Sequence, residues 1–194
     1  MTPERKQRIT SVLDARQPDL TVVLENVHDP HNISAVMRSC DAVGLQEIFI
    51  LNTRISRHEK FGKKSSASAA KWLTVNQFDN IEDCVSMLKR RNYKLFATHL
   101  GEQSHSLYEL DLTAPVALVF GNEHSGVSDE VLKHCDGNFI IPQVGMIKSL
   151  NISVACAVSL YEAFRQRQLK DYYAQCRLPD NMRNPLAAQW ELEE

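Results

Sequence analysis

Polar residues that could orient a reacting group occur in three separate parts of the sequence. Asn32 and Arg38 are six residues apart in a predicted helix. Six residues make nearly two turns, so both side chains can face the same side of the helix, about 9 Å apart along its axis. Glu123 lies in a loop bounded by two glycines, and Ser149 and Asn151 precede an apolar segment. Together they offer a guanidinium, a carboxylate, amides and a hydroxyl, which could hold a polar ligand.

Each of these residues also has a purely structural interpretation. Ser149 could cap the helix that follows it, and for Ser149 taken alone we favour capping by about two to one. Asn32 is similarly well placed to cap its own helix after the turn at Asp29-Pro30. Arg38, taken alone, fits a surface or salt-bridged arginine, and Glu123 an exposed loop carboxylate. The choice between a structural and a functional role therefore depends on the strands and helices that position these residues.

Apolar runs alternate with helical periodicity along the whole chain, which predicts an α/β fold with a largely parallel sheet. Loops that leave the carboxyl ends of strands are where such sheets bind ligands, and Glu123 follows one predicted strand directly. The helix from residue 150 is apolar nearly all round, as core or interface helices are. Strands are predicted at 20–24, 47–51, 72–75, 94–98, 115–120 and 138–141, and helices at 3–16, 32–43, 81–91, 128–135, 150–161 and 182–190.

Composition excludes several classes of protein. The net charge is −2, the apolar fraction is 43%, and the five cysteines form no C-x-x-C pair. We therefore expect a reduced, cytoplasmic protein without disulfides or a zinc site. The chain contains no apolar run long enough for a membrane span and no secretory signal. His28 and His31 lack further ligands nearby in the sequence, so we predict no metal.

Positive charge is concentrated in one segment despite the near-neutral total. The segment 54–71 contains a single acidic residue, Glu59, and the basic residues Arg54, Arg57, Lys60, Lys63, Lys64 and Lys71. A local basic patch of this kind can contact phosphates. By composition alone a solvated loop is the more common explanation.

The seven glycines exclude the usual nucleotide-binding fingerprints. No two are separated by a single residue, so G-x-G-x-x-G is absent. Gly121 and Gly126 have the spacing of a P-loop, but Val127 replaces its lysine. Any cofactor must therefore be bound in another way.

Four segments together carry a family resemblance: Asn32-x5-Arg38, Ala97-Thr98, Phe120-Gly-Asn-Glu-His-Ser-Gly126 and Ile141-Pro-Gln-Val-Gly-Met-Ile-Lys-Ser-Leu-Asn-Ile-Ser-Val-Ala155. Their order and spacing resemble the SPOUT superfamily of RNA methyltransferases, and within it the TrmH branch. The resemblance covers nearly the whole chain. The last segment is the most specific of the four, whereas the first alone would be weak.

The resemblance implies a fold that periodicity could not reveal. It implies a SPOUT (α/β-knot) domain over 20–168, with helices on both faces of the sheet and a C-terminal trefoil knot at about 118–165. Residues 1–19 and 169–194 would be helical extensions. It further implies a homodimer through the C-terminal knot helices.

The resemblance also implies roles for individual residues. Arg38 occupies the catalytic arginine position, with Asn32, Glu123, Ser149 and Asn151 as supporting polar residues. The cofactor would be S-adenosylmethionine, held by Thr98, Gly121, Ile141, Met146 and Leu150. The partner would be tRNA, contacted by Arg8, Arg16, Arg54, Arg57, Lys60, Lys63 and Lys64.

The implied substrate is the 2′-hydroxyl of guanosine 18 in the D-loop of tRNA. Alternatives are a ribose of 23S ribosomal RNA, another tRNA ribose, or a non-catalytic RNA-binding protein with this fold. A nucleotide-binding signalling domain is disfavoured because no phosphate loop exists. The chain departs from the tRNA enzymes at Lys148, where they usually have glutamine, and in the Asn122-Glu-His-Ser turn.

Overall fold

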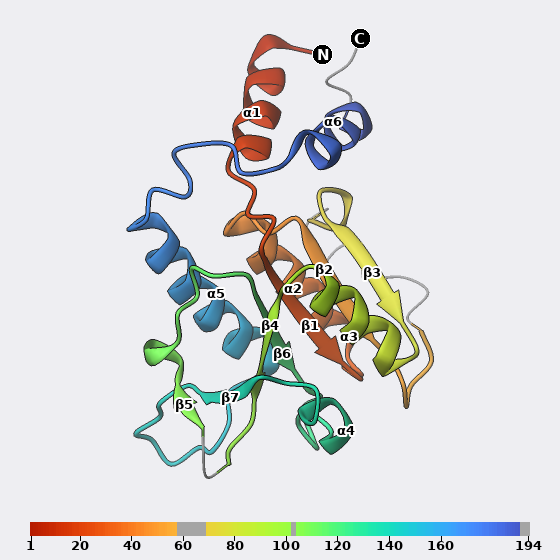
Figure 1. The fold of residues 1–194 in the computed structure, drawn as a ribbon, viewed down its shortest axis with the longest axis vertical. Helices are drawn as coiled ribbons and strands as arrows, with labels where there is room; N and C mark the ends of the chain where they lie inside the picture. The colour runs from red at the N-terminus through yellow and green to blue at the C-terminus, as the bar shows by residue number, and fades with distance from the viewer. Residues whose placement is uncertain (58–68, 102–103, 191–194) are drawn as a thin grey trace.

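A parallel sheet of seven strands forms the centre of the computed structural model, which describes residues 1–57, 69–101 and 104–190. The strand order is β3-β2-β1-β6-β4-β7-β5, and every neighbouring pair is parallel. This confirms the predicted class (Figure 1). The strands are β1 (Leu20–Glu25), β2 (Glu47–Leu51), β3 (Thr74–Phe78), β4 (Lys94–Thr98), β5 (His105–Ser106), β6 (Val116–Phe120) and β7 (Gly137–Ile140).

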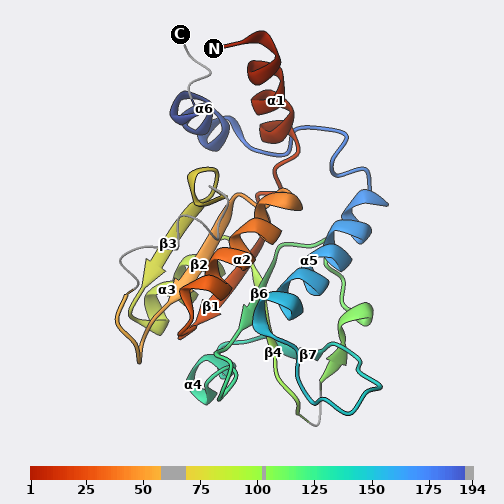
Figure 2. The ribbon, with the colours of Figure 1, turned by 180° about the vertical axis from the view of Figure 1, so that it is seen from behind.

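Helices cover both faces of this sheet, as expected (Figures 1 and 2). Val22 and Leu24 of β1 pack in the cluster that contains α2 and α5, whereas Val23 packs in the cluster that contains α3 and α4. Strands buried on both faces are continuously apolar, which is why the sequence revealed them. The helices are α1 (Pro3–Asp14), α2 (Pro30–Ala42), α3 (Ile81–Arg90), α4 (Asp129–Leu132), α5 (Ile152–Gln168) and α6 (Asp180–Gln189).

Neither Asn32 nor Ser149 caps its helix. The cap of α2 is Asp29, whose Oδ1 accepts a hydrogen bond from the backbone N–H of His31 at 2.8 Å, with Pro30 as the first helical residue. The cap of α5 is Asn151, not Ser149, and its Oδ1 accepts from the N–H of Ser153 at 2.8 Å. The cap of α2 therefore lies three residues before Asn32, and that of α5 two residues after Ser149, so Asn32 is free to make other contacts.

The strand β7 lies between β4 and β5. It pairs with both, through Ala97↔Asn138 and His105↔Phe139. Because β4 and β5 are consecutive in the chain, the last strand is inserted within a loop that an earlier segment forms. The expected knot requires such an insertion, and its threading remains a prediction.

The first and last helices pack against each other at one end of the molecule (Figures 1 and 2). Ile9 and Leu13 of α1 share a buried cluster with Leu186 of α6 and with Trp190. An ion pair at 2.8 Å between Arg183 and Asp14 joins the two helices at their surface. No helix within the described ranges has both the length and the apolar character that crossing a membrane requires.

Candidate functional site

Three of the predicted polar residues form one hydrogen-bonded chain. Asn32 Nδ2 donates to Glu123 Oε1 at 2.7 Å, and Asn151 Nδ2 donates to Asn32 Oδ1 at 3.2 Å. Asn151 Oδ1 accepts in turn from Ser153 Oγ at 2.6 Å. This Glu123–Asn32–Asn151 chain joins the loop after β6, the start of α2 and the start of α5. It leaves one carboxylate oxygen of Glu123 outside these bonds.

The loop that carries Glu123 is held in shape by its own residues. Asn122 Oδ1 accepts from the backbone N–H of His124 at 2.9 Å and of Ser125 at 2.8 Å. Gly126 has a positive φ of 68°, and a Cβ added to Gly121 would lie 1.9 Å from the carbonyl carbon of Gly126. This close approach requires glycine at 121, and Gly126 suits the left-handed backbone.

Arg38 and Ser149 do not join the chain. Both are exposed, and within the described residues neither makes a side-chain hydrogen bond or an ion pair. The guanidinium of Arg38 is therefore available to a ligand on the same helix that supplies Asn32. The structure thus joins three of the five predicted catalytic residues by hydrogen bonds. The other two, Arg38 and Ser149, are exposed; Arg38 follows Asn32 on α2, and Ser149 precedes Asn151.

Residues predicted to hold a cofactor lie at one edge of the sheet. Thr98 ends β4, Gly121 follows β6 and Ile141 follows β7, and these three strands are neighbours in the sheet. Thr98 Oγ1 donates to the carbonyl of Val119 at 3.3 Å. Their position at the carboxyl edge of a parallel sheet is typical of ligand sites.

The loop 142–150 completes this edge. Within the described part of the chain, its residues make no backbone-to-backbone hydrogen bond. Its peptide N–H and C=O groups are uncharged donors and acceptors, which suit the edge of an adenine, so these residues fit S-adenosylmethionine. Leu150 is half-buried, but the side chain of Met146 is 99% exposed and contributes no wall to the site.

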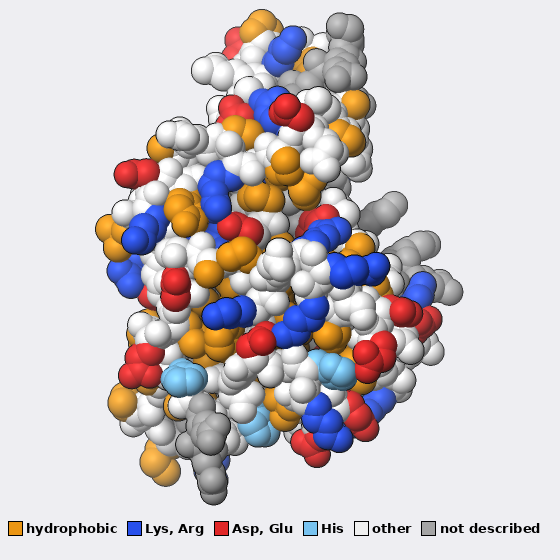
Figure 3. Space-filling model, in the orientation of Figure 1, with side chains coloured by type: hydrophobic (Ala, Val, Ile, Leu, Met, Phe, Trp, Pro, Cys, Tyr) orange, Lys and Arg blue, Asp and Glu red, His pale blue; other side chains and the backbone are white. Residues whose placement is uncertain are grey.

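The expected RNA contacts differ in their exposure. Arg8 is exposed on α1. Arg54 and Arg57 are exposed too, and form ion pairs with Glu130 at 2.6 Å and with Asp79 at 2.9 Å. Lys60, Lys63 and Lys64 lie outside the described residues. On the face drawn in Figure 3, basic and acidic side chains are interspersed.

The expectation that Arg16 contacts RNA is wrong. Its side chain is 0% exposed, donating to the carbonyl of Leu45 at 2.7 Å and to Asp41 at 2.7 Å. The guanidinium also lies 5.3 Å from the ring centroid of Trp190. Burial lowers the pKa of Arg16, and the neighbouring Asp41 opposes that shift. Arg16 therefore joins α2 to the terminal helices.

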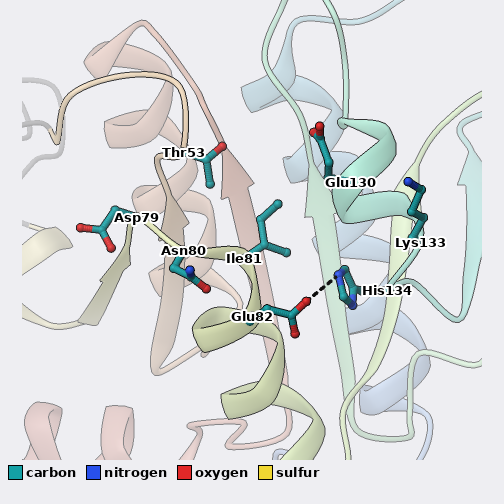
Figure 4. Close-up of a pocket in the computed structure, with 8 residues that line it drawn as sticks. All are labelled: Thr53, Asp79, Asn80, Ile81, Glu82, Glu130, Lys133 and His134. Carbon is teal, nitrogen blue, oxygen red and sulfur yellow. Dashed lines mark ion pairs between the residues drawn. The ribbon is translucent and has the colours of Figure 1, made fainter.

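A groove of about 430 Å³ between α3 and α4 was not predicted from the sequence (Figure 4). An ion pair at 3.4 Å between Glu82 and His134 crosses it. Its lining contains acidic and basic side chains in similar numbers and includes no residue of the Glu123–Asn32–Asn151 chain. We therefore place the candidate site at the Glu123–Asn32–Asn151 chain of hydrogen bonds and not in this groove. The described residues contain no cluster of three or more metal-ligand side chains.

The chain is similar to known proteins in both sequence and fold. Residues 19–161 match the SpoU rRNA Methylase family. The chain is 42% identical over 189 residues to a tRNA (guanosine(18)-2′-O)-methyltransferase of Thermus thermophilus, covering 97% of this chain and 96% of that protein. It resembles the crystal structure of the A. aeolicus TrmH/SpoU tRNA modifying enzyme with a TM-score of 0.89 at 36% identity, covering 96% of this chain and 94% of that one.

A third similarity bears on the cofactor. The SpoU methyltransferase AviRb from Streptomyces viridochromogenes, solved in complex with AdoMet, matches with a TM-score of 0.72 at 26% identity over 80% of this chain and 60% of that chain. The cofactor expected for this chain is thus bound by that relative. Since the family match spans most of the sequence and a full-length relative exceeds 40% identity, this chain belongs to the SpoU rRNA Methylase family.

Proposed function

We propose that this protein transfers a methyl group from S-adenosylmethionine to the 2′-hydroxyl of guanosine 18 in tRNA. The observation that carries the proposal is the Glu123–Asn32–Asn151 chain, which links three family segments beside an exposed arginine. The similarity over 97% of the chain to an enzyme named for this reaction supports the choice of tRNA.

The reaction needs alignment more than it needs strong acids or bases. S-Adenosylmethionine, when bound, supplies an activated methyl group. Thr98, Gly121, Ile141, Met146 and Leu150 would hold it, most of them through backbone groups. The Glu123–Asn32–Asn151 chain would fix the wall against which the ribose is placed. Positioning of this kind contributes on the order of 7–11 kcal/mol to a barrier.

Arg38 would orient the ribose hydroxyl. An arginine keeps its proton at ordinary pH, so Arg38 is suited to stabilise negative charge as it develops on the oxygen. The exposed guanidinium carries no competing ion pair within the described residues. Ser149 would support the same hydroxyl from the loop before α5.

Arg8, Arg54 and Arg57 would bind tRNA phosphates, together with Lys60, Lys63 and Lys64 of the undescribed segment. Arg54 and Arg57 are held by exposed carboxylates, and exposed ion pairs contribute little free energy. A phosphate can therefore replace Glu130 or Asp79 as the partner at small cost.

The protein would act as a cytoplasmic homodimer. Exposed apolar side chains gather on the loop before α5 and on α5 itself: Val144, Met146, Ile147, Val154 and Tyr161. Such a surface is typical of an interface. Sedimentation equilibrium should give twice the mass of the chain, and a monomer at micromolar concentration would contradict this.

Mapping of the methylated nucleotide tests the proposed function. The purified protein and labelled S-adenosylmethionine are incubated in two separate reactions, one with unmodified tRNA and one with 23S ribosomal RNA. We expect label at guanosine 18 of tRNA. Label in ribosomal RNA or at another tRNA ribose would assign the activity to those substrates. RNA binding without label in any RNA would identify a non-catalytic RNA-binding protein.

A further inference from the structure

Two histidines face each other beside the Glu123–Asn32–Asn151 chain. His28 lies between β1 and α2, and His124 lies between β6 and α4. Their ring centroids are 6.4 Å apart, with the ring planes tilted by 59°. The hydrogen bond from Asn32 to Glu123 joins the second of these loops to the first turn of α2, which directly follows the first loop. Both side chains are exposed, and within the described residues neither makes a hydrogen bond or an ion pair.

Both loops hold their histidine in a fixed turn. On the first loop, Asn26 Oδ1 accepts from the backbone N–H groups of Thr53 and Arg54, each at 2.9 Å. On the second, Asn122 Oδ1 accepts from the backbone N–H of His124 itself. The two rings are therefore presented by anchored backbone, although their edges are open to solvent.

The surroundings favour an anion between the rings over other ligands. The tilt rules out a parallel pair that would enclose a nucleobase, and no third metal-ligand side chain joins them within the described ranges. The positive end of α2 begins at Pro30, close to His28. Of the nearby carboxylates, Asp29 accepts a hydrogen bond from the backbone of His31, and one of the two oxygens of Glu123 accepts from Asn32.

We propose that His28 and His124 together bind one of the two phosphodiesters that flank the methylated ribose. Each imidazole offers an N–H group that can donate a hydrogen bond to an anion. Hydrogen bonds of about 2.9 Å from both rings to one phosphoryl group are compatible with the 6.4 Å separation of the centroids. The bound phosphodiester would hold the ribose against the Glu123–Asn32–Asn151 chain. This inference rests on the proposed function, because it assumes an RNA substrate.

The first measurement is the tRNA dissociation constant of His28→Ala, His124→Ala and the double variant. A hydrogen bond to a charged group contributes enough for the double variant to bind about tenfold or more weakly. Affinity for S-adenosylmethionine should not change. The matched control is His134→Ala, which lies in the groove between α3 and α4 and pairs with Glu82, and its tRNA affinity should match the parent.

The decisive measurement pairs these variants with altered RNA. Each flanking phosphodiester is replaced, one at a time, by an uncharged methylphosphonate. One replacement should weaken binding to the parent and leave binding to the double variant unchanged. Equal losses in both proteins, or no loss in the parent, would overturn the inference. His28→Gln with His124→Gln repeats the measurement should the alanine variants lose their cofactor affinity.

Failure of this inference and failure of the proposed function give different results. The comparison of the parent with the double variant on unaltered and methylphosphonate RNA uses dissociation constants and does not require turnover. A parent protein that binds RNA but transfers no methyl group would contradict only the proposed function. Methyl transfer with equal losses in parent and variant would contradict only the histidine pair.

Discussion

Asn32 can form hydrogen bonds to other segments because it does not cap its own helix. Asp29 caps α2, so the amide of Asn32 is free to donate to Glu123 and to accept from Asn151. An amide does both at once, which neither a carboxylate nor a hydrophobic residue can do. The residue at this position therefore decides whether three separate segments are held together.

We expect Asn32→Ala to lower turnover by about tenfold to a hundredfold, since one or two hydrogen bonds of about 1–1.5 kcal/mol each are lost. Asn32→Asp should be worse, because it sets a second carboxylate against Glu123. Steady-state methyl transfer at saturating S-adenosylmethionine gives the measurement. Asn80→Ala is the control: Asn80 caps α3 by accepting from Asp83 N–H at 3.1 Å, and its loss should cost about 1 kcal/mol of stability but no turnover. Unchanged turnover in Asn32→Ala would remove the chain from the mechanism.

Arg38→Ala should abolish methyl transfer and leave affinity for S-adenosylmethionine intact, because the guanidinium makes no contact that holds the described structure together. Arg38→Lys keeps the charge but loses the planar donor pair, so partial recovery would assign the effect to charge. Calorimetry and labelled-methyl transfer measure the two properties. Near-normal turnover by Arg38→Ala would exclude Arg38 from the reaction.

The sequence anticipated the site's composition better than its local geometry. Family motifs brought Asn32, Glu123 and Asn151 into one hypothesis, and the structure joins them. The caps were missed because two polar residues near the start of each helix could each have capped it, Asp29 or Asn32 for α2 and Ser149 or Asn151 for α5. The burial of Arg16 was missed because its partners come from distant parts of the chain, at Asp41, Leu45 and Trp190.

At the scale of elements, Arg167 ties the end of α5 to the start of β1. Its side chain is 0% exposed, and its guanidinium donates to Asp19 Oδ1 at 2.5 Å and to the carbonyls of Leu112 at 2.9 Å and Ala114 at 3.1 Å. Arg177 binds the other oxygen of Asp19 at 2.8 Å. One buried cation thus connects α5, the segment before β6 and the segment before β1.

Replacing Arg167 by alanine should destabilise the protein by about 3–5 kcal/mol, since a buried ion pair loses one partner and three acceptors lose their donor. Urea denaturation followed by circular dichroism measures the change. Arg165→Ala is the matched control two residues away, because Arg165 is exposed and pairs with Glu162 on its own helix. Equal stability of the two variants would show that the buried network is dispensable.

The pKa of Asp136 predicts a pH effect on the packing of α3. Burial alone would raise that pKa, but hydrogen bonds from Lys89 Nζ and from the N–H of Leu95 outweigh it, so the pKa is lowered. A lowered pKa contributes stability above the unfolded value of about 3.9, which is lost as pH falls through the folded value. The parent should therefore exceed Asp136→Asn in stability at pH 7 by more than at pH 3. A constant difference in urea midpoints would contradict this.

Strand bounds were predicted well where the sequence carries an apolar run and poorly where it does not. β2 and β4 have their predicted bounds, because both carry apolar runs. β3 begins two residues later than expected, since Trp72 instead packs edge-on against Trp190 with centroids 5.2 Å apart. β5 has only two residues, which is too short for any periodicity to show.

At the scale of the whole molecule, the proposed RNA partner would bind to a protein of nearly balanced charge. The net charge is −2, and the face in Figure 3 mixes both signs. Affinity should still fall steeply with salt, since phosphate contacts release counterions locally.

Replacing both Arg54 and Arg57 by alanine should reduce the slope of log affinity against log salt by roughly 1.4 to 1.8. Arg91→Ala, whose guanidinium pairs with Glu47 at the opposite edge of the sheet, should leave it unchanged. An unaltered slope in the double variant would exclude those two arginines from the interface.

The meeting of α1 with α6 has a consequence for synthesis on the ribosome. Ile9 and Leu13 leave the ribosome well before Leu186 and Trp190, which cover them. Asp19 is likewise translated long before its partners Arg167 and Arg177. The apolar side of α1 therefore stays uncovered until these later residues have been translated, and over that interval it is a target for ribosome-associated chaperones.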